Sequence, residues 1–146
     1  MPISQLDTNK IEELQGQLLN AGIPVLDVAD DIAMVPLIGL IDSAKSQKLM
    51  EDMLYNIKTN ETKIIILDIL GISVVDSAVA SHLIKITKAT KLMGCETIIS
   101  GISPSIAQTM VNLGIEIENL ITTATLKNAL SLAYQKTGYV MKKLNG

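Results

Sequence analysis

Short runs of apolar residues alternate along this chain with longer segments whose apolar positions recur at helical spacing. The run IIIL within residues 63–69 is typical of a strand buried on both faces of a sheet. In residues 43–58, apolar side chains fall on one face of a helix instead. The same criteria predict further strands over 23–28, 32–40, 96–100 and 117–121, and further helices over 7–20, 77–93, 104–114 and, after a cap at Thr122 or Thr123, as far as residue 136.

The order of these elements predicts an α/β fold built on one mixed, mostly parallel β-sheet. Strands that alternate with helices favour parallel pairing through right-handed crossovers. A turn at Asp30-Asp31 alone separates the first two strands, so we expect them to form an antiparallel hairpin. Pro36 in the second strand indicates an edge position or a bulge. We expect about four helices to cover this sheet.

The length of 146 residues predicts a single domain. We expect this domain over residues 22–138, with an N-terminal helix or linker at 1–21 and a C-terminal tail at 139–146. Ile11, Leu14 and Leu18 in the first segment have the spacing of a coiled-coil seam. That helix either folds back on the domain or contributes to a dimer, and two turns are too few to dimerise alone.

The composition narrows the classes of function. Hydrophobic residues make up 48% of the chain, the net charge is −3, and the aromatic residues are three tyrosines, so nucleic-acid binding is not expected. There is no long apolar stretch and no signal-peptide pattern, so we expect a cytoplasmic protein that does not cross a membrane. With one cysteine, Cys95, and one histidine, His82, neither a metal nor another cofactor is expected.

Motifs for catalysis are scarce, and we expect no enzyme activity. The chain lacks GxxxxGK[ST], GxGxxG, HExxH and GxSxG. His82 lies five positions after Ser77 on the same predicted helix, which turns it away from that serine and argues against a hydrolase. We expect His82 at the surface or partly buried, and Cys95 as a small core residue. Gly101-Ile-Ser-Pro is only a weak candidate for a nucleotide phosphate.

Two acid–hydroxyl pairs, Asp42-Ser43 and Asp76-Ser77, lie where a loop enters a predicted helix. One interpretation is plain N-terminal capping, because aspartate and serine oxygens accept hydrogen bonds from the first amides of a helix. The other is that each serine is a phosphoacceptor. A phosphate there meets the positive end of the helix dipole, and it adds a charge of about −1.5 to −2 without unfolding the helix.

Three segments of the sequence resemble the STAS domain, named for sulfate transporters and anti-sigma factor antagonists. They read VPLIGLIDSAKSQKLMEDML (35–54), IIILDILGISVVDSAVASHLIK (64–85) and KLMGCETIISGISPSIAQTMVNLGI (91–115). The pattern DxxGxxxxDS from Asp68 to Ser77 and the segment from Gly101 to Ile115 carry the resemblance together. It covers about residues 22–136 and is strongest to the stressosome branch, the scaffold and co-antagonist proteins of bacterial stress signalling.

The resemblance implies a non-enzymatic protein that is controlled by phosphorylation. Family members are modified on serine or threonine by a GHKL-type kinase, are reset by a serine phosphatase, and assemble with other STAS proteins. The main acceptor of the family falls on Ser77 here and the second acceptor of the co-antagonists on Ser43. Asp76, Asp42 and Asp68 then support these sites or contact the partner.

This chain also departs from the family pattern. Co-antagonists usually have threonine at both acceptor positions, whereas this chain has serine at both. Before Gly22 it has only a short predicted helix, where co-antagonists typically carry a sensory domain.

Two other readings of the sequence remain open. One is an aspartyl-phosphate receiver that uses Asp68, with Asp30 and Asp31 as a Mg²⁺ pair. Against it, the acidic pair falls in a predicted hairpin turn and no Lys-Pro follows the last strand. The other is a purely structural scaffold in which both serines only cap helices.

Overall fold

A tight hairpin begins the sheet of the computed structural model, which describes residues 23–138. Strand β1 (Leu26–Ala29) pairs antiparallel with β2 (Ile32–Ile38), as the sequence predicts. Asp31 at the turn has a φ of 68°, and its carbonyl accepts hydrogen bonds from the amides of Lys63 (2.8 Å) and Ile64 (3.0 Å). The turn is thereby fastened to the start of the neighbouring strand.

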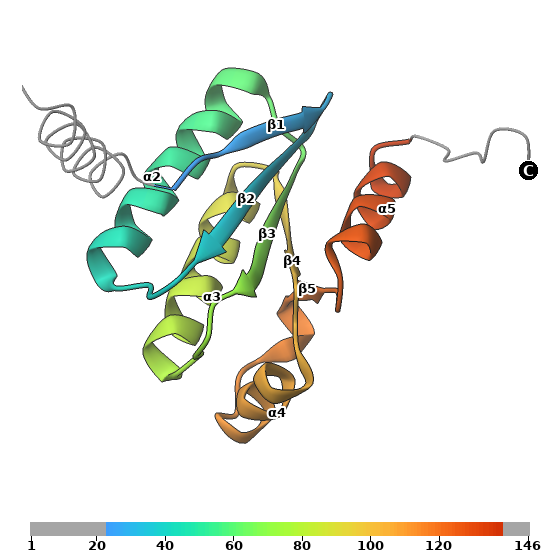
Figure 1. The fold of residues 1–146 in the computed structure, drawn as a ribbon. Coiled ribbons are helices and arrows are strands. Elements are labelled where there is room, and N and C mark those ends of the chain that lie inside the picture. The colour runs from blue at the N-terminus through green and yellow to red at the C-terminus, as the bar shows by residue number, and fades with distance from the viewer. Residues whose placement is uncertain (1–22, 139–146) are drawn as a thin grey trace, which may run out of the picture.

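The remaining strands are parallel, so the sheet is mixed, and its five strands follow the order β1-β2-β3-β4-β5 (Figure 1). This confirms the predicted α/β class. The parallel strands after β2 are β3 (Ile64–Gly71), β4 (Glu96–Ser100) and the short β5 (Ile121–Thr122). The described helices are α2 (Ser43–Asn60), α3 (Ser77–Leu92), α4 (Pro104–Asn112) and α5 (Leu126–Lys136), with a 3₁₀ turn η1 at Ile117–Asn119.

Helices cover both faces of the sheet, and Figure 1 shows α2 and α3 on one side with α5 on the other. The protein has one hydrophobic core on each face of the sheet, and strand β3 contributes side chains to both, since successive side chains of a strand point to opposite faces. Leu67 packs in the larger core with Met53 of α2 and Leu83 of α3. Ile66 packs in the smaller core with Ala133 of α5. The apolar run of β3 is therefore buried on both faces, as expected.

The structure distinguishes between the two alternatives predicted for Pro36, an edge position or a bulge. Pro36 does mark an irregularity, because the β2–β3 register shifts between Pro36 and Ile38, but β2 is not an edge strand. Pro36 is tolerated because β1 pairs only as far as Met34, so the hairpin ladder does not reach the proline.

The predicted strand over 117–121 and the cap of the last helix were partly wrong. Residues 117–119 form the turn η1 instead, and only 121–122 pair with β4. The last helix is capped by Thr125, whose Oγ1 accepts from the amide of Asn128 (3.1 Å), rather than by Thr122 or Thr123.

The predicted helix over 7–20 and the tail over 139–146 lie outside the described residues. Within residues 23–138, no helix is both long and apolar enough to cross a membrane.

Candidate functional site

Ser43 and Ser77 are each the first residue of a helix that follows a parallel strand. Ser43 begins α2 after β2, and Ser77 begins α3 after β3. Because β2 and β3 are neighbours and run parallel, their carboxyl ends meet at one edge of the sheet, seen at the lower end in Figure 1. Both serines are exposed at this carboxyl edge. The fold thus brings together two candidate acceptors that are far apart in the sequence.

The two loops that lead to these serines are tied to each other. The amide of Gly39, after β2, donates to the carbonyl of Gly71, at the end of β3, over 3.1 Å. A Cβ at Gly71 would lie 2.8 Å from the carbonyl oxygen of Leu37, so this approach requires glycine. This hydrogen bond therefore links the β2–α2 connection directly to the end of β3.

The aspartates, and not the serines, cap the two helices. Asp42 Oδ1 accepts from the amide of Lys45 (2.7 Å), and Asp76 Oδ1 accepts from the amide of Val79 (2.9 Å). Neither hydroxyl, of Ser43 or of Ser77, makes a hydrogen bond to another residue in the described part of the chain. The capping interpretation accounts for the aspartates and leaves the serine hydroxyls available.

Asp68 is half-buried near the end of β3 and packs against the end of β4. Its Oδ1 accepts a 2.7 Å hydrogen bond from the Oγ of Ser100, a fully buried residue on β4. The next residue, Gly101, has a φ of +80°, and a Cβ there would lie 2.6 Å from the amide of Leu70 and 2.7 Å from Asp68 Oδ1. Asp68 is thus held by one hydrogen bond and by close packing at Gly101.

The arrangement of acids argues against the receiver alternative. Asp30 and Asp31 lie at the hairpin turn before β2, whereas Asp68 lies toward the far end of β3. The acidic pair and the proposed acceptor are therefore at opposite ends of the sheet and cannot share a Mg²⁺ ion. Among residues 23–138, no group of three or more His, Cys, Asp or Glu side chains could hold a metal.

Four exposed apolar residues lie at the carboxyl edge, where the chain leads from β2 and β3 toward the two serines. We call them the rim patch. It consists of two residues at the ends of strands β2 and β3 and two in the connections that follow them, with their exposed fractions: Ile38 (77%), Leu70 (72%), Leu40 (77%) and Val74 (63%). Large apolar side chains this exposed at a functional edge are typical of a surface that binds another protein. A phosphate on either serine would place charge at the same edge.

Sequence reasoning missed the members of the rim patch and the partner of Asp68. Apolar residues that flank Gly39 and Gly71 could have indicated the patch, since they fall where the predicted strands end. No comparable signal marks Ser100, because a serine in a strand gives no indication of which neighbour it will face.

The two residues assigned to structural roles lie as expected. Cys95 is 1% exposed, and burial raises the pKa of its thiol to about 12. His82 is half-buried on α3. Neither takes part in the carboxyl edge.

The family model described as "STAS domain" matches residues 24–129. The chain belongs to the STAS domain family. This confirms the resemblance that the segments around Asp68–Ser77 and Gly101–Ile115 indicate.

Two curated relatives of this STAS chain come from Bacillus subtilis (strain 168). The RsbT co-antagonist protein RsbRA is 36% identical over 135 residues, which are 92% of this chain and 48% of the relative. The RsbT co-antagonist protein RsbRD is also 36% identical, over 88% of this chain and 45% of the relative. The STAS chain thus spans about half the length of these curated relatives.

Solved structures agree with the family. A serine-to-glutamate variant of Moorella thermoacetica RsbS superposes with a TM-score of 0.68 and 27% identity, over 80% of this chain and 97% of that one. A chain from the stressosome, described as a signal integration and transduction hub, gives a TM-score of 0.63 and 26% identity over 78% of this chain and 98% of that chain.

Proposed function

We propose that this STAS protein is a non-enzymatic antagonist of the stressosome type, which binds a GHKL-type serine/threonine kinase and is controlled by phosphorylation. Ser77 is the main acceptor and Ser43 the second. Other STAS proteins are its assembly partners, and a serine phosphatase resets it. The relatives support the class, since they are co-antagonists of RsbT and a stressosome component.

One observation carries the proposal: both serines are exposed, their hydroxyls are unbonded within the described residues, and they lie at the same edge of the sheet as the rim patch. A kinase can reach a hydroxyl at the first position of a helix without opening the fold. The carboxylate of Asp76 already accepts a hydrogen bond from the amide of Val79. The first two amides of α3, those of Ser77 and Ala78, have no acceptor within the helix itself. A phosphate on Ser77 therefore keeps favourable electrostatics with α3.

The phosphate acts on binding through charge beside an apolar surface. Burying the rim patch against a partner requires removing water from its surroundings. A dianion on Ser77, three residues after Val74, opposes this, because a charge loses hydration when it is taken out of water. Phosphorylation would thus weaken binding while the fold of the domain stays the same, which suits a switch.

The proposal is tested by binding of the cognate kinase to the full chain. We compare the wild-type chain with Ser77→Glu, and with Ser131→Glu as a matched control, because Ser131 is exposed on α5 on the opposite face of the sheet. We expect Ser77→Glu to raise Kd at least about tenfold, corresponding to 1.4 kcal/mol, and the control to leave it unchanged.

Equal affinity of wild type and Ser77→Glu would contradict the charge mechanism. If the kinase is folded and binds nucleotide but binds neither the wild-type chain nor Ser77→Glu, it is not a partner of this protein.

A further inference from the structure

A groove of about 280 Å³ begins at Ser77 and runs between α3 and the residues that follow α4. Its α3 wall follows helical spacing, so it extends about 16 Å along the helix at 1.5 Å per residue. The other wall comes from two residues that follow α4. The lining residues are Ser77, Ala80, Ser81, Ile84, Lys85, Lys88, Leu113 and Ile115.

The groove combines apolar walls with two unpaired positive charges. Leu113 is 43% exposed, and Ile84 and Ile115 are half-buried, so the groove offers apolar contact. Lys85 and Lys88 are both exposed, and neither forms an ion pair with another residue of the described chain. No acidic side chain is among the lining residues.

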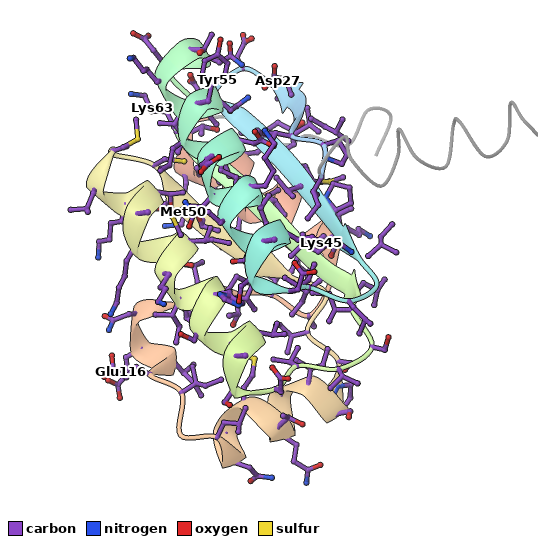
Figure 2. The ribbon with its side chains drawn as sticks, turned by 90° about the vertical axis from the view of Figure 1, so that its left-hand side faces the viewer. Asp27, Lys45, Met50, Tyr55, Lys63 and Glu116 are labelled. Carbon is purple, nitrogen blue, oxygen red and sulfur yellow. The ribbon has the colours of Figure 1, made fainter. Side chains whose placement is uncertain are left out.

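This charge is opposite to that of the protein as a whole. The chain has a net charge of −3, so a basic, apolar groove is a local exception. Figure 2 shows the outer face of α3 toward the viewer, with Glu116 labelled below and to the left of the helix. Glu116 follows Ile115 directly in the sequence but does not line the groove.

We propose that this groove docks an acidic, partly apolar segment of the partner kinase. Charge complementarity selects the occupant: carboxylates at helical spacing would face Lys85 and Lys88, while apolar side chains between them would contact Leu113 and Ile115. This inference rests on the proposed function and adds to it a second contact region, beside the rim patch, with its own chemistry.

Ser77 gives the groove its regulation. It lies eight residues before Lys85, or about 12 Å along the helix, which is too far for a phosphate on Ser77 to be neutralised by that lysine. At the Ser77 end of the groove, the phosphate would instead repel any carboxylate of the docked segment that comes within about 8 Å, the screening length at physiological salt. One modification would then act on both contact regions at once.

The test compares kinase affinity for the double variant Lys85→Glu/Lys88→Glu and a matched control, Lys63→Glu/Lys127→Glu. All four lysines are exposed, and the control pair lies outside the groove while changing the net charge equally. We expect Kd to rise at least about tenfold for the groove variant and to change less than about threefold for the control. Amide NMR shifts on kinase binding should include Ile84, Leu113 and Ile115.

The outcomes separate this inference from the proposed function. If Ser77→Glu weakens binding while Lys85→Glu/Lys88→Glu binds like wild type, the groove proposal is wrong and the phosphoswitch stands. If the groove variant weakens binding and Ser77→Glu does not, the docking groove stands and the switch at Ser77 is wrong. Equal losses in the groove variant and the control would show a general charge effect and overturn the groove. A kinase that does not bind the wild-type chain overturns both.

Discussion

The hydroxyl of Ser100 donates a 2.7 Å hydrogen bond to Oδ1 of Asp68, which joins the ends of β4 and β3 just before the loop that leads to Ser77. Ser100 is fully buried and Asp68 is half-buried. Hydrogen bonds to an ionised carboxylate are stronger than neutral ones, and a buried group left without its partner is destabilising. This hydrogen bond therefore stabilises the ends of β3 and β4 at the carboxyl edge of the sheet.

Removing the Ser100 hydroxyl should destabilise the domain. We expect Ser100→Ala to lower the free energy of unfolding by about 1–3 kcal/mol, because Asp68 loses a donor in a poorly hydrated place. Urea denaturation measures this, with Ser105→Ala as control, since Ser105 is an exposed serine in the first turn of α4. A Ser100→Ala protein as stable as this control would mean that the hydrogen bond contributes nothing.

Gly101 and Gly94 offer a matched pair for the packing of this edge. Both have a φ of +80°, but a Cβ at Gly94 meets nothing within 4 Å, whereas one at Gly101 meets Leu70 and Asp68. Gly94→Ala should cost about 1–2 kcal/mol for the left-handed conformation alone. Gly101→Ala should cost about 1–3 kcal/mol more, because backbone must move. Equal losses, measured by thermal or urea unfolding, would refute the close packing.

The contrast between these glycines also shows how far sequence reasoning reaches. The helix predicted over 77–93 ends at Leu92, close to Gly94, whose amide donates to the carbonyl of Lys91 and whose φ is positive. That signal is local. The role of Gly101 depends on Leu70 and Asp68, which are some 30 residues away, so no local pattern contains it.

In the candidate site, too, some features follow from the local sequence and others become visible only in the structure. The positions of Ser43 and Ser77 at helix starts follow from local sequence and family pattern, and their meeting at one edge follows from parallel topology. The separation of roles between Asp76, which caps, and Ser77, which does not, required the geometry. The basic groove required it too, since Leu113 and Lys85 come together only when α4 packs near α3.

Substitutions at Asp76 and Ser77 should therefore differ in their effect on stability. Asp76→Ala removes the oxygen that accepts from Val79 and should cost about 1 kcal/mol. Ser77→Ala removes no hydrogen bond within the described residues, and alanine favours the helix, so the change should stay within about 0.5 kcal/mol of wild type. Chemical denaturation of both variants checks this. A large loss in Ser77→Ala would restore the structural interpretation of that serine.

Cys95 should be unreactive in the folded protein. Burial raises the pKa of its thiol from 9.0 to about 12, so the thiolate that attacks disulfide reagents is scarce at neutral pH. We expect labelling by a disulfide reagent at about pH 8 to proceed only as the protein unfolds, and to be immediate in urea. Rapid labelling of the native protein would contradict the burial of Cys95.

The same pKa shift predicts a dependence of stability on alkaline pH. Below pH 9 the thiol is protonated in both states; between pH 9 and about 12 only the unfolded chain loses this proton, so the free energy of unfolding falls as pH rises. Wild type should lose stability more steeply than Cys95→Ala in this window, as urea unfolding at about pH 8 and about pH 10.5 would reveal. If wild type and Cys95→Ala lost the same amount of stability between these pH values, the raised pKa of Cys95 would be excluded.

The central claim is that Ser77 receives the phosphate. The most direct measurement is incubation of the full chain with its cognate kinase and ATP, followed by intact mass and fragment mass spectrometry of wild type, Ser77→Ala and Ser43→Ala. The account predicts one main phosphate on Ser77 that survives acid, is lost in Ser77→Ala and is kept in Ser43→Ala. Phosphate that persists unchanged in Ser77→Ala, or an acid-labile phosphate on Asp68, would contradict it.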